Sequence, residues 1–354
     1  MGVIGAGAWT VYSHLPVLAK RRDELDFVAV NRLGRAELDA VQQRFGFAVA
    51  SENYRDVLDA GIDLCVVASP PSLHHEHAKA ALQAGAHVLV EKPFTLTVAD
   101  AWDLHDTAER LNRHLVVAFG YNHLPAVQRF QAALRDAGGI GAIESCQLSM
   151  ASCTRELLTV GGSYPEVGHD DVPAPDPRTW TDPSVSGGGY ASAQLTHLLG
   201  LALPLLGAIP TEITATTSGI AGSSIDSHDA AVLRFGNGAV GTMSGSSSWV
   251  GVDSSRDLVT LRAYGSEGQW LLDLDAERAY VFRDGDKVER TLPMPPGSGT
   301  YDCTGPPNTL VDLALGRDVV NRSPAGLAAH TVEVLDAFYR SVATASPAQV
   351  RSRP

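Results

Sequence analysis

The first 120 residues alternate short, nearly continuous apolar runs with stretches of helical periodicity, and this pattern restricts the fold more than any other feature. The runs are rich in Val, Ile and Leu, as in strands that are buried on both faces of a sheet. They occupy residues 1–4, 27–30, 64–68, 87–90 and 115–119. One intervening helix is expected over residues 97–111, with Thr97 and Asp100 at its start. Strand–helix alternation with short links requires right-handed crossovers, so the pattern predicts a doubly wound parallel sheet.

After about residue 120 the pattern changes to short strands joined by polar turns. Strands are expected over residues 141–151, 230–235, 239–243, 258–264, 269–274, 279–283 and 287–292. The Gly-Asn-Gly turn at 236–238 predicts a hairpin, and consecutive hairpins indicate a mostly antiparallel sheet. A last helix is expected, with Ser323 as N-cap and Pro324 as its first residue. We therefore predict an α/β protein with two domains, residues 1–121 and residues 122–354, the second being α+β with an open sheet.

The charge balance excludes several kinds of partner. The 354 residues carry 27 Lys and Arg against 40 Asp and Glu, a formal net charge of -13. Such a charge repels phosphate backbones and anionic lipid, so we expect neither a nucleic acid nor a membrane as partner. No apolar run reaches the ~18 residues of a membrane span. The four cysteines are scattered without C-x-x-C spacing, which is typical of reduced thiols in a cytoplasmic protein.

A glycine-rich turn follows the first expected strand. Gly5-Ala6-Gly7 leads directly into Ala8, Trp9 and Thr10, at the start of a helix. The first glycine permits a tight turn, and the second lets backbone amides approach a pyrophosphate at the helix N-terminus. Thr10 takes the place of the third glycine of the usual fingerprint. The turn predicts a Rossmann dinucleotide-binding domain over residues 1–121.

The end of the second expected strand bears on the choice of cofactor. An NAD site usually has an acidic side chain here, which binds the adenosine ribose. This chain has Asn31 and Arg32, an uncharged residue followed by a cation that can pair with a 2′-phosphate. The sequence therefore favours NADP over NAD. The alternative is that both residues are merely solvated at the strand end and that the cofactor is NAD.

Two further motifs follow later strands. Ser69-Pro70-Pro71 precedes a helix that begins near His74, and Glu91-Lys92-Pro93 follows the strand at 87–90. Neighbouring histidines at 74, 75 and 77 point to different helix faces, so no metal site is expected. A lysine at the carboxyl end of a parallel strand faces the cofactor crevice, where its ammonium stabilises a developing alkoxide. The alternative for Lys92 is an ordinary surface lysine.

These motifs occur in one order along the chain. They are Gly5-Ala6-Gly7, Ser69-Pro70-Pro71 with His74, Glu91-Lys92-Pro93, Gly120-Tyr121-Asn122, and Gly187-Gly188-Gly189 with His197. With the two-part layout, the set resembles the Gfo/Idh/MocA oxidoreductase family, which includes glucose–fructose oxidoreductase and inositol dehydrogenase. The resemblance covers nearly the whole chain. It implies a Rossmann domain joined to an open antiparallel sheet that makes the contact of a homodimer or homotetramer.

The resemblance also implies roles for individual residues. Lys92 would be the catalytic lysine beside the nicotinamide, followed by a cis bond to Pro93, and His197 would relay the proton. Cofactor contacts are expected from Gly5, Gly7, Ala8, Trp9, Thr10, Asn31, Arg32, Ser69, Pro70, His74, Glu91, Lys92 and Asn122. Substrate contacts are expected from Lys92, Tyr121, Arg178, Trp180, Tyr190, Gln194 and His197. Aromatic rings among them can stack on the apolar face of a sugar.

The chain departs from the family pattern next to His197. The family typically has an Asp four residues before this histidine, and here that position is Ala193. A carboxylate there would orient the imidazole and raise its pKa. Gln194 or a carboxylate of the long Pro- and Gly-rich stretch at 161–189 (Asp170, Asp171 or Asp176) is a candidate replacement. A histidine that is simply part of the core is the alternative for His197.

The function expected from this set is hydride transfer between NAD(P) and a ring carbon of a sugar, glycoside or cyclitol. Lys92 would polarise or deprotonate the hydroxyl, with His197 as proton relay. Two alternatives stay open. One is redox-assisted elimination of a glycoside with recycled NAD, and the other is a non-catalytic sensor of NAD(P) or sugar, which the loss of the Asp at position 193 favours.

Overall fold

The computed structural model describes residues 1–159, 176–220, 223–248, 257–285 and 288–353. They form two compact units that alternate along the chain. Unit 1 contains residues 1–119, the described part of 160–187, and residues 303–332, and unit 2 contains the rest. The domain boundary after residue 121 stays a prediction.

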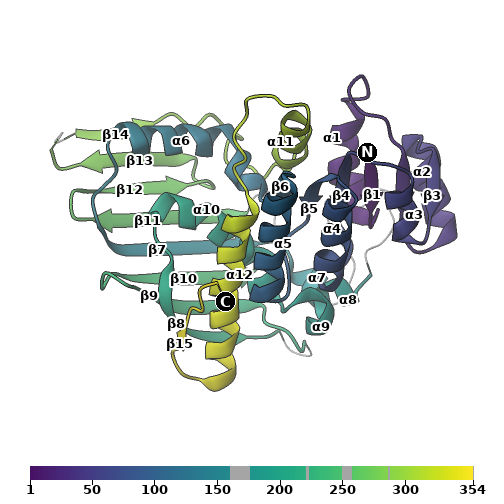
Figure 1. Ribbon diagram of the computed structural model, residues 1–354. Helices are drawn as coiled ribbons and strands as arrows, with labels where there is room; N and C mark the ends of the chain where they lie inside the picture. The colour runs from purple at the N-terminus through teal and green to yellow at the C-terminus, as the bar shows by residue number, and fades with distance from the viewer. Residues whose placement is uncertain (160–175, 221–222, 249–256, 286–287, 354) are drawn as a thin grey trace. The chain divides into compact units, whose positions relative to one another are not determined.

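Unit 1 is built on a six-stranded parallel sheet with the order β3-β2-β1-β4-β5-β6 (Figure 1). The strands are β1 Gly2–Ile4, β2 Ala29–Asn31, β3 Val49–Ser51, β4 Leu64–Val67, β5 His87–Val90 and β6 Leu115–Val117. Five of them match the predicted apolar runs. Strand β3 was not predicted, because a three-residue edge strand that is half exposed has no apolar run to reveal it.

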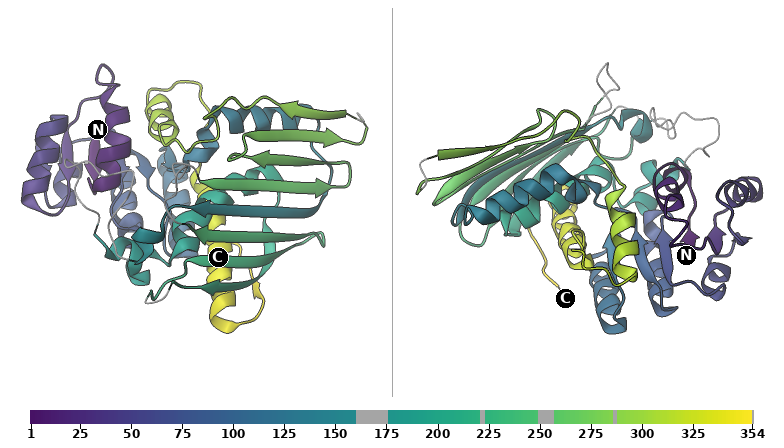
Figure 2. Two further views of the ribbon diagram at one scale, coloured as in Figure 1. Left: turned by 180° about the vertical axis from the view of Figure 1, so that it is seen from behind. Right: turned by 90° about the horizontal axis from the view of Figure 1, so that it is seen from above.

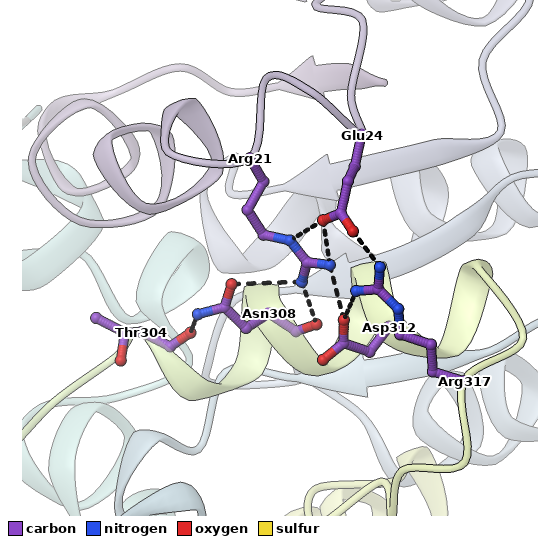
Figure 3. A network of polar contacts seen from close by, with 6 residues as sticks. All are labelled: Arg21, Glu24, Thr304, Asn308, Asp312 and Arg317. Carbon is purple, nitrogen blue, oxygen red and sulfur yellow. Dashed lines mark hydrogen bonds and ion pairs between the residues drawn. The ribbon is translucent and has the colours of Figure 1, made fainter.

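Helices cover both faces of this sheet, as in a doubly wound fold (Figures 1 and 2). One face packs against α3 Tyr54–Asp59, α4 His74–Gln83, α5 Val98–Leu111 and the start of α12 Ala325–Thr344. The other packs against α1 Leu15–Ala19, α2 Arg35–Phe45 and α11 Gly305–Ala314. Four short helical turns among the described residues complete the unit, namely η1 Thr10–His14, η2 Pro71–Leu73, α8 Arg178–Thr181 and α9 Pro183–Ser186. A network of ion pairs ties α11 to the turn after α1 (Figure 3).

Helix starts follow local capping chemistry. In α5 the hydroxyl of Thr97 accepts the amide of Asp100 at 3.1 Å, as predicted. The start of α12 differs from the prediction by one residue. The carbonyl of Ser323 accepts the amide of Val117 in β6 (2.9 Å), and the carbonyl of Pro324 accepts the first helical bond, from the amide of Ala328. Ser323 was predicted as the N-cap because its bond to β6 is a tertiary contact that the local sequence does not show.

Unit 2 is built on a nine-stranded sheet with the order β14-β13-β12-β11-β7-β10-β9-β8-β15. The strands are β7 Ile143–Ser152, β8 Pro210–Ser218, β9 His228–Phe235, β10 Val240–Ser247, β11 Leu258–Gly265, β12 Gly268–Asp273, β13 Arg278–Arg283, β14 Val288–Leu292 and β15 Ala348–Gln349. All pairs are antiparallel except β7 with β10. The predicted fold class is therefore confirmed. Strands β8 and β15 were not predicted.

One face of this sheet is buried and the other is largely exposed. Along β9 and β10 buried and exposed residues alternate, as a sheet packed on one side requires. Helices α6 Pro125–Asp136 and α10 Thr196–Leu206 lie on the buried face (Figure 2). Short turns η3 Gly120–His123, α7 Arg155–Thr159 and the π-helical η4 Ala191–Leu195 complete the unit, and η4 runs directly into α10.

Candidate functional site

The glycine-rich turn after β1 has the geometry of a phosphate-binding loop. Gly5 has φ 86°, and a Cβ there would lie 2.3 Å from the amide nitrogen of Ser69, so only glycine fits. A Cβ on Gly7 would meet no atom within 4 Å, which leaves the backbone open to a ligand. Ala8 and Trp9 then begin the helix. Thr10 stands where the usual fingerprint has its third glycine, and its hydroxyl donates to the carbonyl of Gly5 at 3.0 Å.

The end of β2 is tied to this turn. The carbonyl of Asn31 accepts the amides of Gly5 (3.0 Å) and Ala6 (2.9 Å), while its side chain donates to the carbonyl of Ser51 (3.0 Å). The guanidinium of Arg32 donates to the carbonyl of Ala6 at 3.3 Å, and partial burial lowers its pKa. A cation therefore lies against the glycine-rich turn.

Glu91 is the centre of a buried hydrogen-bond cluster. Its Oε1 accepts from the indole nitrogen of Trp9 (2.9 Å) and from Nε2 of His14 (2.6 Å). Its Oε2 accepts the amide of Lys92 at 2.9 Å. Burial opposes ionisation, but the hydrogen bond and charge of His14, with Lys92, lower the pKa of Glu91 overall. The carboxylate thus joins the helix after the glycine-rich turn to the backbone of Lys92.

Lys92 follows β5 at the carboxyl edge of the parallel sheet, and its side chain is half buried. Its Nζ lies 5.9 Å from the ring centroid of Trp180, within the range of a cation–π contact. The Lys92–Pro93 bond is cis, which confirms that prediction. Lys92 and Trp180, 88 residues apart in the chain, are thus neighbours in unit 1.

The three histidines of α4 have separate partners. His74 lies between the carbonyls of Ser69 (2.7 Å from Nε2) and Pro93 (2.8 Å from Nδ1), and burial lowers its pKa. His77 contacts the hydroxyl of Ser69, and His75 pairs with a carboxylate of α5. Within the described part of the chain, no group of three or more His, Cys, Asp or Glu side chains is arranged to hold a metal ion. His74 instead fastens the turn after β4 to the turn that follows Lys92.

In unit 2 three aromatic rings near the start of α10 contact one another. The imidazole of His197 packs edge to face against Tyr121 (5.8 Å between centroids) and Tyr301 (5.3 Å), which also contact each other. The hydroxyl of Tyr121 donates to Oδ2 of Asp257 at 2.5 Å. Burial and the charge of Asp257 raise the pKa of Tyr121 well above its usual range, so this hydroxyl stays a donor.

The remaining predicted site residues have varied surroundings. Asn122 donates to the carbonyl of Gly200 (2.9 Å). Tyr190 is fully buried, and its hydroxyl contacts Ser152 and the carbonyl of Met150. We therefore do not include Tyr190 among the residues proposed to contact the substrate. Gln194 is buried on η4, and Pro70 is half buried beside η2. Arg178 is exposed and paired with Asp176 (2.7 Å), whereas Asp170 and Asp171 lie outside the described residues.

Six residues in these contacts, or beside the start of the helix that carries His197, were not predicted from the sequence. They are His14, Asp226, Asp229, Asp257, Tyr301 and Tyr339. All but Asp229 reach a partner across a large sequence separation, for example 136 residues between Tyr121 and Asp257, whereas Asp229 lies three residues from Asp226. The spacing of residues along the sequence does not predict a contact of this kind. An isolated tyrosine or aspartate between short strands was the only available signal.

Two family descriptions match the chain. Residues 1–119 match "Oxidoreductase family, NAD-binding Rossmann fold", and residues 130–271 match "GFO/IDH/MocA C-terminal domain". The chain therefore belongs to the Gfo/Idh/MocA oxidoreductase family, and its N-terminal residues form the NAD-binding Rossmann fold of that family. No helix among the described residues is long and apolar enough to cross a membrane.

Several relatives are sugar dehydrogenases by name. Levoglucosan dehydrogenase of Pseudarthrobacter phenanthrenivorans is 26% identical over 293 residues, which cover 75% of this chain and 70% of that protein. D-glucoside 3-dehydrogenase of Escherichia coli is 29% identical over 210 residues, covering 58% and 54%. A solved levoglucosan dehydrogenase in complex with NADH and levoglucosan has a TM-score of 0.76 at 21% identity, over 99% of both chains. The last comparison shows the shared fold.

Proposed function

We propose that the chain is an NAD(P)-dependent dehydrogenase or ketoreductase that acts on a CH–OH group of a sugar, glycoside or cyclitol. The observation that carries the proposal is the carboxyl edge of the parallel sheet, where an open glycine-rich turn and the half-buried Lys92 share one hydrogen-bond cluster through Glu91. In open α/β sheets this edge is where dinucleotides bind. The names of the relatives support a carbohydrate as substrate.

Each group of this chain has a simple task in such a reaction. The amides of the glycine-rich turn and the helix N-terminus bind the pyrophosphate. The cofactor, when bound, exchanges a hydride with the substrate carbon. The ammonium of Lys92 stabilises negative charge on the substrate oxygen, and His197 takes or returns the proton. Trp180, beside Lys92, offers an aromatic face to the apolar side of a sugar ring.

Replacement of Lys92 tests this assignment. A panel of sugars, glycosides and cyclitols is assayed with NAD and with NADP, and the best substrate is then used with the variants. We expect Lys92→Met to lower kcat by about 10²–10³-fold or more, because an ammonium is lost where charge develops. The dissociation constant for NAD(P)H, measured by fluorescence, should change less than about twofold. Lys79→Met, a surface lysine paired with Asp103, is the matched control.

Three results would contradict the proposal in different ways. Unchanged turnover in Lys92→Met removes the assigned role of the lysine. Tight nucleotide binding without turnover across the whole panel supports a sensor instead. Bond cleavage without net change in nicotinamide absorbance supports elimination.

We further propose that the cofactor is NADP. The uncharged Asn31 and the guanidinium of Arg32, held against the glycine-rich turn, support this choice. Arg32→Ala should raise the dissociation constant of NADPH by about tenfold or more, since a hydrogen bond to a charged group contributes about 1.5–3 kcal/mol. Binding of NADH should change little. Arg340→Ala is the control, because Arg340 pairs with Asp336 in α12. Tighter binding of NADH than of NADPH by the unaltered chain would assign NAD.

A further inference from the structure

The helix that carries His197 begins with four amides that the helix itself cannot satisfy, as every helix does. Here they belong to residues 189–192, since the amide of Ala193 already bonds the carbonyl of Gly189. Asp226 satisfies three of them. Its Oδ1 accepts the amide of Gly189 (2.9 Å), its carbonyl that of Tyr190 (2.9 Å), and its Oδ2 that of Ala191 (2.8 Å).

Tyr339 of α12 satisfies the fourth amide. Its hydroxyl accepts from Ser192 (3.0 Å) and donates to Oδ1 of Asp226 (3.1 Å). The turn closes tightly on this hydroxyl, since Gly188 has φ 148° and a Cβ there would lie 2.1 Å from it. The start of the helix is therefore fixed by one carboxylate and one phenol from distant parts of unit 2.

A second carboxyl group lies beside this cap. Asp229, in β9, is 5% exposed, and no donor of the described protein reaches either of its oxygens. Its carboxyl group contacts that of Asp226, and such a contact is a hydrogen bond only when one of the two carries a proton. The backbone neighbours of Asp229 in the sheet, Thr217 and Gly245, are uncharged. The other titratable groups that act on the pair are the hydroxyls of Tyr190 and Tyr339.

We propose that Asp229 is a positioning residue that keeps its proton and donates it to Asp226, and that this bond completes the cap of the helix carrying His197. Asp226 already accepts three donors through its carboxylate, so the proton belongs to Asp229. Burial, followed by the charge of Asp226 and the hydrogen bond to it, raises the pKa of Asp229 to about 9. Above that pH two adjacent carboxylates repel each other and weaken the cap.

The sign of the pH dependence follows from linkage. The pKa of Asp229 lies above its unfolded value of about 3.9, so the folded chain holds a proton that the unfolded chain has released. This group therefore lowers the free energy of unfolding progressively as the pH rises from about 4 to about 9. Asp229→Asn removes that dependence, because an amide donates to Asp226 at every pH.

The test compares unaltered protein with Asp229→Asn, Asp226→Asn and Asp136→Asn, the last being an exposed residue of α6. At pH 7 the infrared spectrum should show a protonated carboxyl band that is lost in Asp229→Asn and disappears with a midpoint near pH 9 in the unaltered protein. The thermal midpoint should fall between pH 7 and pH 10 in the unaltered protein and in Asp136→Asn, but much less in Asp229→Asn. Asp226→Asn should lower it already at pH 7.

Activity supplies a separate readout, which rests on the proposed function through His197. The ratio of unaltered to Asp229→Asn turnover should fall about tenfold from pH 7 to pH 10, one unit above the pKa. An absent carboxyl band at pH 7, or equal pH dependence of the thermal midpoint in the two proteins, would overturn the proposal. Failure of the proposed function would leave the infrared and thermal results unaffected, so the two failures are distinguishable.

Discussion

At the scale of single residues, Glu91 shows how one carboxylate can couple two motifs. Trp9 and His14 follow the glycine-rich turn, and Lys92 follows β5, yet all three donate to this one side chain. The sequence suggested a contact between Glu91 and the cofactor. Both of its oxygens instead accept from the chain itself, and we propose that Glu91 positions Lys92.

Glu91→Gln tests that role. The amide keeps the size of the side chain but presents an NH2 group to the donors, so at least one buried donor loses its acceptor. We expect the free energy of unfolding to fall by about 2–4 kcal/mol, measured by denaturant titration. We also expect kcat to fall more than the dissociation constant of NAD(P)H rises, since Lys92 is displaced.

Glu76→Gln is the matched control, because this carboxylate of α4 is more than half exposed and accepts from Tyr54. It should change the stability by no more than about 0.5 kcal/mol. A Glu91→Gln protein with unaltered stability and kcat would show that the cluster does not position Lys92.

At the scale of elements, a polar network links α11 to the turn after α1, in addition to the apolar packing of this helix (Figure 3). Arg21 pairs with Glu24 (2.5 Å) and Asp312 (2.7 Å) and also donates to the carbonyl of Asn308. Arg317 pairs with the same two carboxylates. The side chain of Arg21 is only 14% exposed, so its pairs are less screened than those at the surface.

Arg21→Met should therefore destabilise the protein by about 1–2 kcal/mol. Arg35→Met, which breaks the exposed pair with Asp39, should cost less than about 0.5 kcal/mol. Hydrogen bonds from Arg317 and Arg21 lower the pKa of Glu24. Burial raises the pKa of Asp312, but hydrogen bonds from the same two arginines to that carboxylate lower it overall. A carboxylate whose pKa is lowered by folding stabilises the folded chain at pH values above its unfolded-state pKa, and this stabilisation is lost as the pH falls. The difference between Arg21→Met and the unaltered chain should thus shrink from pH 7 to pH 3, which urea titrations at both pH values would show.

At the scale of the whole molecule, the open face of the nine-stranded sheet supports the predicted homo-oligomer. Val232, Val240 and Leu258 are 44–50% exposed on β9, β10 and β11, where β9 pairs with β10 and β7 lies between β10 and β11. Gln147, Ser149, Thr242, Ser244, Thr260 and Arg262 form a shallow groove on the sheet. An exposed sheet face that carries apolar side chains is typical of a surface that binds another copy. We propose that two copies of the chain meet here.

Val232→Glu should then lower the molar mass measured by light scattering to that of a smaller species, because it introduces a charge that the interface would bury without a partner. Val320→Glu, at a valine that is 67% exposed in unit 1, should leave the mass unchanged. A monomeric unaltered chain at micromolar concentration would refute the interface.

Site features that a short motif carries were predicted from the sequence, whereas those that depend on tertiary contacts were not. The glycine-rich turn was predicted because a short motif carries it, and the cis bond after Lys92 was predicted because the resemblance to the family implied it. His14 and Asp229 were not predicted, because a histidine inside a helix and an aspartate at a strand start look ordinary until their partners are known. Ala193 raised the question of a replacement carboxylate. Among the described residues, Asp257 reaches Tyr121, whose ring contacts His197, and this link joins residues that are far apart in the chain.

The sequence alone determined the parallel sheet, the antiparallel sheet and the order of the motifs, because burial on one or two faces gives each strand its own period of apolar residues. Tertiary structure decided what the polar side chains do. Glu91 and Asp226 find their partners in distant segments, and Asp229 owes its raised pKa first to burial and then to the charge of Asp226. Neither burial nor such neighbours are encoded in local spacing, so only the folded chain assigns these carboxyl groups their roles.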